Sequence, residues 1–384
     1  MRGTAILFVL LYHFNVMGGK DIVWPDRFAG AIANSLWIGV DLFFVLSGFL
    51  ITGILIDAKS KPNYFRNFYA RRVLRIFPLY YLFVFALVFV LPHVVRGFEE
   101  PLHYLSSNQG WLWTYTTNVL IAVRADWTTA VPLANHFWSL AIEEQFYLVW
   151  PAVVLACDRR RLLIVCIAMI ALAPALRTAV WLAGGNYLQA YVLTPARMDS
   201  LAVGALLAAL VRSPAGMALA ARWSKPVLIG GLALTAAMFC LRGLRFSEAD
   251  AAVYTLGYSI VALTFGGLIV RAIVGGGVIE RIMTLPPLRT FGTYAYGMYV
   301  FHPVVLRVFA DHLSPRLHLP LVLGSKIGLQ LWSWSTGIAV TFIVALASWH
   351  AYEKHFLKLK NRFRDEREAP RETRPAGTIE EFAK

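Results

Sequence analysis

The chain alternates between long apolar runs and short breaks that carry charge, proline or glycine. A membrane-spanning helix needs about 20 residues to cross roughly 30 Å of hydrocarbon. We place ten helices on the apolar runs, at residues 3–19, 34–56, 74–95, 137–156, 162–182, 197–211, 226–242, 251–272, 288–309 and 328–350. The pattern predicts an all-α polytopic membrane protein, a bundle of about ten transmembrane helices, whose first span is not cleaved as a signal peptide.

The remaining segments are predicted to lie outside the bilayer. The longest, residues 96–136, is mildly apolar and rich in aromatic residues, so we expect it to lie along the membrane interface and not to span. Residues 361–384 carry high charge, two prolines and few apolar side chains, which predicts a disordered tail. The chain therefore divides into a transmembrane domain over residues 1–360 and a tail over residues 361–384.

Composition and charge narrow the function classes. Of the 384 residues, 58% are hydrophobic and 15% are charged, which excludes a soluble enzyme. The net charge of +14 is not read as nucleic-acid binding, because the basic residues lie in the short segments between apolar runs. Placing 25 of the 36 Lys and Arg residues on one side and eight on the other predicts that both termini are cytoplasmic. The three cysteines have no metal-ligand spacing, and we expect no metal site.

Ionisable residues inside predicted spans are costly and are functional candidates. Arg2 and His13 share one face of the first helix, roughly 16 Å apart, with His13 toward the outer end. Asp41 on the second predicted span is expected at the depth of His13. The outer half of the bundle is therefore predicted to hold a polar layer.

Two further spans contribute to this layer. His136, Ser139 and Glu143 are spaced by three and four residues, which predicts one polar stripe on a helix, with Glu144 beside it. Tyr299 and His302 are likewise three apart on the ninth span.

A second, cationic layer is predicted at the cytoplasmic mouth. Arg71, Arg72 and Arg75 lie within one helical turn, and Arg2 joins them from the first helix. Clustered guanidinium groups suit phosphate oxygens. A phosphate-bearing donor below and a histidine layer above is an arrangement for transferring a group to an acceptor at the outer side.

Seven segments together resemble one protein family. They are Arg2 and His13 as Arg-x10-His, VDLFFVLSGFLI at 40–51, YFRNFYARRVLRIFPLYYL at 64–82, HFWSLAIEEQFYLVWP at 136–151, RMDSLAVGALLA at 197–208, YGMYVFHPVV at 296–305 and YEKHF at 352–356. In this order they resemble the acyltransferase-3 family of integral membrane O-acyltransferases. The resemblance implies a bacterial-type inner-membrane enzyme without a permanently bound cofactor. It also implies acyl-CoA, in particular acetyl-CoA, as co-substrate from the cytoplasm.

The same resemblance implies an acceptor hydroxyl on a glycan, a lipid-linked sugar or a glycosylated small molecule. The family's first-helix His and Arg correspond to His13 and Arg2, and its RxxR motif to Arg72 and Arg75. Since only the short tail follows the last span, we expect no esterase-like domain of the kind that some relatives carry.

Acyl transfer to an alcohol needs a base, and neutral histidine serves near pH 7. We therefore expect His13 to be the base, oriented by Asp41 or Glu143. Ser139, Tyr299 and His302 are each suited to stabilise the oxyanion, and the sequence does not choose among them. It also leaves open direct transfer or an acyl-histidine intermediate.

Several of these assignments have structural alternatives. Residues expected at the acceptor side are His136, Trp138, Arg197, Asp199 and Tyr299. Arg197 and Asp199 also fit a local charge pair, and Glu143 and Glu144 also fit structural partners of the arginines. Arg71 also fits a simple positive-inside anchor. Nine of the 12 tryptophans are predicted toward the outer face, which fits sugar stacking or an aromatic belt.

A transporter or flippase for an anionic or glycosylated substrate is the rival function. A polar bundle with an arginine mouth suits it equally well. Against it, the chain shows no duplicated pair of interrupted helices, the pattern typical of secondary transporters.

Overall fold

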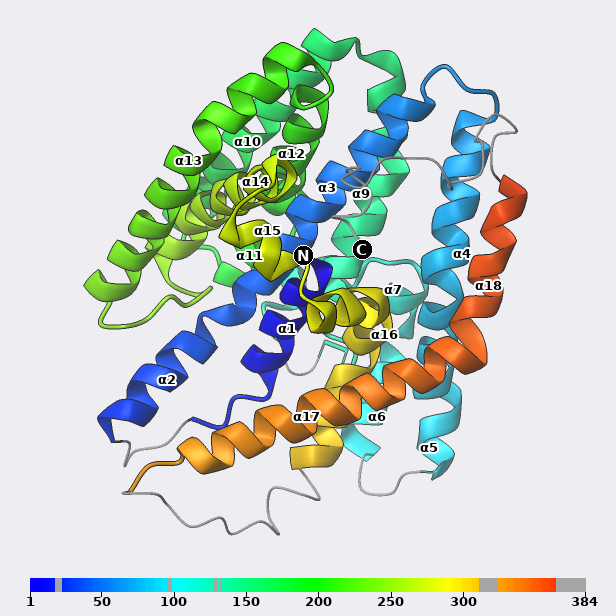
Figure 1. Cartoon of the computed structure of the whole chain (residues 1–384). Coiled ribbons are helices and arrows are strands. Elements are labelled where there is room, and N and C mark those ends of the chain that lie inside the picture. Colours follow the sequence, from blue (N-terminus) through cyan, green and yellow to red (C-terminus); the bar gives the residue numbers. More distant parts are fainter. Residues whose placement is uncertain (18–22, 95–98, 128–129, 132, 311–323, 364–384) are drawn as a thin grey trace.

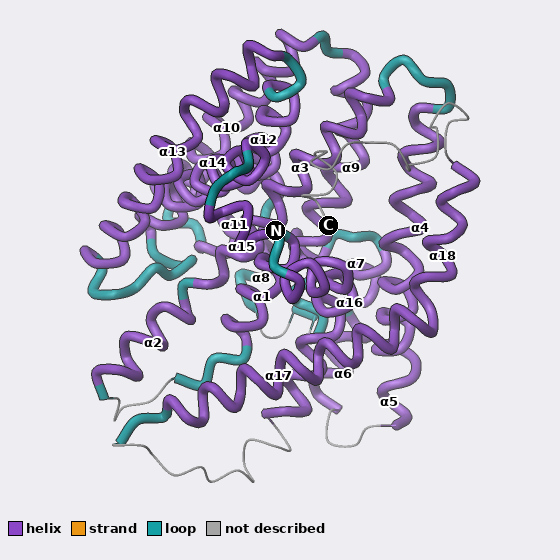
Figure 2. The backbone as a smooth tube through the Cα atoms, viewed as in Figure 1, coloured by secondary structure: helices purple, strands orange, loops and turns teal. Residues whose placement is uncertain are grey.

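The computed structural model describes residues 1–17, 23–94, 99–127, 130–131, 133–310 and 324–363. In this part of the chain the regular structure is helical, and no β-strand occurs (Figure 2). The helices of the first half are α1 Arg2–His13, α2 Trp24–Asn34, α3 Gly39–Ala58, α4 Tyr64–Phe85, α5 Leu91–Val94, α6 Glu99–Ser107, α7 Gln109–Trp113, α8 Thr117–Arg124, α9 Phe137–Ala156 and α10 Arg159–Leu182.

The second half continues in the same way. Its helices are α11 Tyr187–Val192, α12 Thr194–Leu210, α13 Pro214–Leu241, α14 Tyr258–Val274, α15 Val278–Met283, α16 Pro286–Val308, α17 Ile327–Ser348 and α18 Lys354–Leu359. Short π-helical segments extend α4, α14 and α17, at Ala86–Val90, Val253–Gly257 and Trp349–Glu353. A 3-10 turn at Lys360–Phe363 ends the described chain.

The predicted all-α polytopic membrane protein is confirmed. Eight helical segments are long and apolar enough to cross a bilayer. The other two predicted crossings are also helical, as α1, which has 12 residues, and α16, which has 23. Helices α4 and α13 begin at Tyr64 and Pro214, well before the predicted starts at 74 and 226. The reason is that charge limits how deep a residue lies in the membrane but does not stop a helix, since arginine is a good helix former.

The aromatic connection at residues 96–136 is built into the bundle. It forms the short helices α6, α7 and α8, none of which is long enough to cross a membrane. Tyr80 and Tyr81 of α4 donate hydrogen bonds to the carbonyls of Leu112 and Trp113, at 2.7 and 3.2 Å. Helix α8 packs against α9 and α11 with Ile121 fully buried. Part of this connection therefore lies in the core and not along the interface.

Close helix packing places α3 at the centre of the molecule, against α1, α9, α12 and α14 (Figure 1). A Cβ atom at Gly48 of α3 would lie 1.9 Å from the carbonyl oxygen of Leu201, and one at Gly204 of α12 would lie 2.0 Å from that of Val45. Only glycine allows this approach, and small residues at helix contacts are typical of membrane bundles. The α3–α12 contact therefore has a fixed register.

The predicted tail at residues 361–384 is described only in part. Residues 361–363 belong to the last 3-10 turn. Residues 364–384 lie outside the described part of the chain.

Candidate functional site

Three histidines meet between α1, α9 and α16. The ring centroids of His13 and His302 are 4.6 Å apart, and those of His136 and His302 are 5.2 Å apart. His302 and His136 are buried, whereas His13 is half-buried. The structure thus brings together three residues that the sequence analysis placed in one polar layer.

Hydrogen bonds define which nitrogen carries the proton in two of the three rings. Nδ1 of His13 lies 2.8 Å from the carbonyl oxygen of Val9, and Nδ1 of His302 lies 2.7 Å from that of Tyr299. A carbonyl oxygen can only accept, so both Nδ1 atoms donate, and in a neutral ring Nε2 keeps a lone pair. Nε2 of His302 is buried and has no partner in the described chain. The orientation of His13 therefore comes from its own helix backbone.

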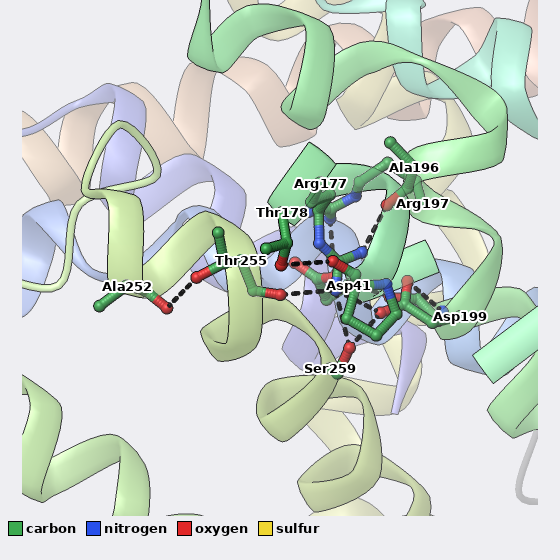
Figure 3. A network of polar contacts seen from close by, with 11 residues as sticks. Asp41, Arg177, Thr178, Ala196, Arg197, Asp199, Ala252, Thr255 and Ser259 are labelled. Atoms are coloured by element: carbon green, nitrogen blue, oxygen red, sulfur yellow. Dashed lines mark hydrogen bonds and ion pairs between the residues drawn. The ribbon is translucent and has the colours of Figure 1, made fainter. Parts of the chain in front are cut away.

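Asp41 does not serve as the orienting partner of His13. Arg197 donates to Asp41 Oδ1 at 2.7 Å (Figure 3), and Ser200 donates to the same oxygen at 2.9 Å. The sequence predicted Asp41 and His13 in one layer, but no hydrogen bond links the two residues. The carboxylate is instead neutralised at the contact between α3 and α12.

Arg197 and Asp199 do not form the local charge pair that was the structural alternative for them. Asp199 pairs with Arg177 of α10 at 2.9 Å and accepts a hydrogen bond from Ser259 of α14 at 2.6 Å (Figure 3). Residues two apart on a helix point about 200° apart, so Arg197 and Asp199 face different neighbours. Arg177, Arg197, Asp41 and Asp199 are all fully buried; their two pairs connect α3, α10 and α12, and the Ser259 hydroxyl adds α14.

A cavity of about 110 Å³ lies among α1, α3, α4, α9 and α16. Its polar lining residues are Arg2, Ser47, Arg72, Arg75, Ser139, Glu143, Tyr147, Tyr296 and Tyr299. Arg2 is at the opposite end of α1 from His13, while Tyr299 lies against His302 with a centroid distance of 5.6 Å. The cavity therefore extends from the arginine layer toward the histidines.

Two hydroxyl groups separate this cavity from the histidines. Tyr299 donates its hydroxyl hydrogen to the carbonyl oxygen of His136 at 2.5 Å. The hydroxyl of Ser139 lies 2.7 Å from that of Tyr299 and is therefore the donor to it. Both residues line the cavity, and the Tyr299 ring also lies 5.2 Å from the His136 ring. A group that enters from the arginine end meets this pair before it meets the histidines.

The cavity arginines have no acidic partner. Among the described residues, no carboxylate forms an ion pair with Arg2, Arg72 or Arg75, and all three are half-buried. Glu143 lines the same cavity within electrostatic range of all three, but it forms no ion pair with them. Arg71 points elsewhere, because its Nε donates to the carbonyl oxygen of Phe363 at 2.8 Å. The structure thus gathers three of the four predicted phosphate ligands.

Trp138 and Trp37 are packing residues in this structure. Trp138 is buried against Tyr191 with ring centroids 4.6 Å apart, and Trp37 stacks on Phe246 at 5.7 Å. Neither ring face is open to a sugar. Trp24, by contrast, is 68% exposed.

Three residues near the site were missed by the sequence analysis. Tyr147 continues the stripe of Ser139 and Glu143 by one more turn, so the same helical spacing would have found it. Lys360 lies near the arginines, and no local pattern signals this. Glu248, in the loop between α13 and α14, accepts a hydrogen bond from Tyr12 at 3.4 Å, and burial raises the pKa of its carboxyl group.

A family model described as an acyltransferase domain matches residues 1–350. The chain belongs to the acyltransferase-3 family. It is therefore a membrane-embedded acyltransferase, as the ordered segments predicted.

Several curated relatives are similar over most of the chain. The putative peptidoglycan O-acetyltransferase YrhL of Bacillus subtilis is 30% identical over 374 residues, which cover 92% of this chain and 53% of the relative. The peptidoglycan O-acetyltransferase OatA of Listeria monocytogenes is 29% identical over 369 residues, covering 92% and 54%. The O-acetyltransferase OatA of Staphylococcus aureus is 26% identical over 338 residues, covering 83% and 51%. The chain thus spans about half the length of these relatives. No solved structure matches it.

Proposed function

We propose that this protein transfers an acetyl or other short acyl group from cytoplasmic acyl-CoA to a hydroxyl group of a glycan or glycosylated acceptor at the outer side. The observation that carries the proposal is the cavity that joins three unpaired arginines to the hydroxyl pair beside the histidines. The relatives' names, which specify O-acetylation of peptidoglycan, support the acetyl group and the glycan acceptor.

The arginine end of the cavity is the proposed donor site. Three guanidinium groups that share one cavity with a single carboxylate, Glu143, and form no ion pair with it leave an excess of positive charge, which is costly in a membrane protein unless an anion neutralises it. Arg2, Arg72 and Arg75 offer planar forks that match phosphate oxygens. The cavity beyond them is lined largely by apolar side chains of α3 and α4, such as Leu46 and Ile76, which suits the arm that carries the thioester.

The histidine end is the proposed reaction site. His13 Nε2 accepts the proton of the acceptor hydroxyl while that oxygen bonds to the thioester carbonyl carbon. Hydroxyl groups of Ser139 and Tyr299 are positioned to donate to the resulting oxyanion. The carbon–sulfur bond then breaks and the leaving thiolate takes the proton from His13, so the products are an ester and the CoA thiol. For this, Ser139 must release Tyr299 and Tyr299 must release the His136 carbonyl, so that both hydroxyl hydrogens can point at the thioester carbonyl oxygen.

Purified protein in detergent provides the test. With acetyl-CoA and a muropeptide or oligosaccharide acceptor, CoA thiol should be released and an ester should form. His13→Ala should lower kcat by roughly 10²–10⁴-fold and leave the donor KM nearly unchanged, because a base acts in the transition state. His350→Ala, which alters an exposed histidine outside the cluster, is the matched control. Activity of His13→Ala within tenfold of the parent would exclude this role.

We also propose that the protein lies in a bacterial inner membrane with both termini cytoplasmic, as the distribution of basic residues supports. A fluorescent reporter fused after Lys384 should be active, and a periplasm-dependent phosphatase fused there should be inactive. The opposite pattern would put the arginine end of the cavity outside, away from cytoplasmic acyl-CoA.

A further inference from the structure

The last described turn packs on the arginine-bearing side of α4. Arg71 donates from Nε to the carbonyl oxygen of Phe363 at 2.8 Å, and the Arg66 guanidinium lies 5.6 Å from the centroid of the Phe363 ring. Helix α18 also lies alongside α4 (Figure 1). The described chain after the last span therefore packs against, and is hydrogen-bonded to, the helix that carries Arg72 and Arg75.

This turn brings Lys360 to the cavity arginines. Lys360 is half-buried and within electrostatic range of Arg75, Arg72, Arg2 and Arg71. Among the described residues its ammonium group has no ion pair and no hydrogen bond. Lys358, two residues earlier, is exposed. A lysine held among four arginines without an acidic partner raises the like-charge repulsion of the site, which a bound anion would relieve.

We propose that Lys360 belongs to the donor site and binds the 3′-phosphate of acyl-CoA. This inference rests on the proposed function. CoA carries a diphosphate next to its pantetheine arm and a separate phosphate monoester on the ribose. If the arm enters the cavity, the diphosphate reaches the arginines that line it, and the ribose phosphate stays outside.

Lys360 occupies that outer position. It is not among the residues that line the cavity, and its turn packs on α4 at Arg71, one helical turn from Arg75, which lines the cavity. An ammonium group is a compact point charge with three donors, which suits a monoester as well as an arginine fork suits a diphosphate. A lipid headgroup offers the same phosphate chemistry at a membrane surface, so the experiment must separate the two sources.

Equilibrium binding to the full-length purified protein separates them. We compare CoA with 3′-dephospho-CoA by titration calorimetry in detergent with a fixed lipid composition. Lys360→Gln should weaken CoA binding about tenfold and leave 3′-dephospho-CoA binding unchanged, since the lost contact is one charge-assisted hydrogen bond. Lys358→Gln should change neither, and Lys360→Arg should restore most of the CoA affinity.

Other outcomes would overturn the assignment. An equal loss for both ligands would assign Lys360 to a lipid headgroup or to folding, and no loss for either would remove it from the site. Acetyl transfer measured on the same samples keeps the two proposals apart. Transfer without a Lys360 effect contradicts only this inference, Lys360-dependent binding without transfer contradicts only the proposed function, and absence of CoA binding contradicts both.

Discussion

Two groups of arginines lie inside this bundle, and they differ in whether a carboxylate forms an ion pair with them. Arg177 and Arg197 are fully buried, and each has a carboxylate within 3 Å, at 2.9 and 2.7 Å. Arg2, Arg72 and Arg75 are half-buried around a cavity and have no carboxylate partner in the described chain. The sequence places the first group inside predicted spans and the second at the cytoplasmic mouth, and of the two only the second lines the cavity.

The physical difference is where each charge is compensated. In the first group the compensation is internal, so the pairs hold α3, α10 and α12 together, and the Ser259 hydroxyl on Asp199 adds α14. Arg197 also lies 4.2 Å from the centroid of the Tyr258 ring, which adds a cation–π contact. In the second group no ion pair supplies it among the described residues, and in the proposed function the donor phosphates do. Substitutions should therefore lower stability in the first group and donor affinity in the second.

The largest effect is expected for Asp41→Ala. It leaves Arg197 as a buried charge without a partner, and we expect the free energy of unfolding to fall by about 3–5 kcal/mol. Denaturation in mixed detergent micelles measures it. Asp57→Ala is the matched control, because its pair with Arg212 is 62% exposed on the Asp57 side and should contribute below about 1 kcal/mol.

Replacing both members of the Asp41–Arg197 ion pair tests whether the lost stability comes from the uncompensated charge. Asp41→Leu with Arg197→Met should recover most of the lost stability, because no charge is left uncompensated. Equal losses for Asp41→Ala and Asp57→Ala would contradict the structural role of the buried pair.

Arg72→Ala and Arg75→Ala should weaken donor binding and leave stability nearly unchanged. Each should raise the KM for acetyl-CoA about tenfold to hundredfold while changing the acceptor KM little, because a charge-assisted contact to phosphate contributes about 1.5–3 kcal/mol. Arg72→Lys and Arg75→Lys should restore only part of this, since lysine lacks the bidentate fork. Steady-state kinetics with both substrates varied provides the measurement.

The free energy of unfolding of these variants should stay close to that of the parent, because the substitutions remove repulsion between like charges. Arg222→Ala, an exposed arginine on α13, is the control for a general charge effect. A donor KM that stays the same in Arg72→Ala and Arg75→Ala would make these residues membrane anchors, and the contrast between the two groups would disappear.

The smallest effect is expected for Ser259→Ala. Its hydroxyl donates to Asp199 at 2.6 Å and accepts from Arg177 at 2.7 Å, so the ion pair survives without it. We expect a loss of about 1 kcal/mol in the free energy of unfolding and no change in kinetics. Ser106→Ala removes an exposed hydroxyl that bonds only to the His103 carbonyl and serves for comparison. A loss as large as that of Asp41→Ala would mean that the hydroxyl, and not the ion pair, holds α14.

The sequence by itself determined the features that depend on local periodicity. Apolar runs predicted where the helices lie, since hydrocarbon thickness sets their length. Helical spacing placed Ser139 and Glu143 on one face, and both line the cavity. The ordered segments predicted the family, which the match over residues 1–350 confirms.

Only the tertiary structure decided which charges meet. Arg197 and Asp199 are neighbours in sequence, but α12 turns them toward Asp41 and Arg177 on two other helices. Arg71 shares a turn with Arg72, yet it binds the carbonyl of Phe363 far along the chain. Periodicity defines which way a side chain faces on its own helix, whereas its partner depends on which helix packs there. Helix packing is decided by the shapes of whole surfaces, such as the glycine contact between α3 and α12.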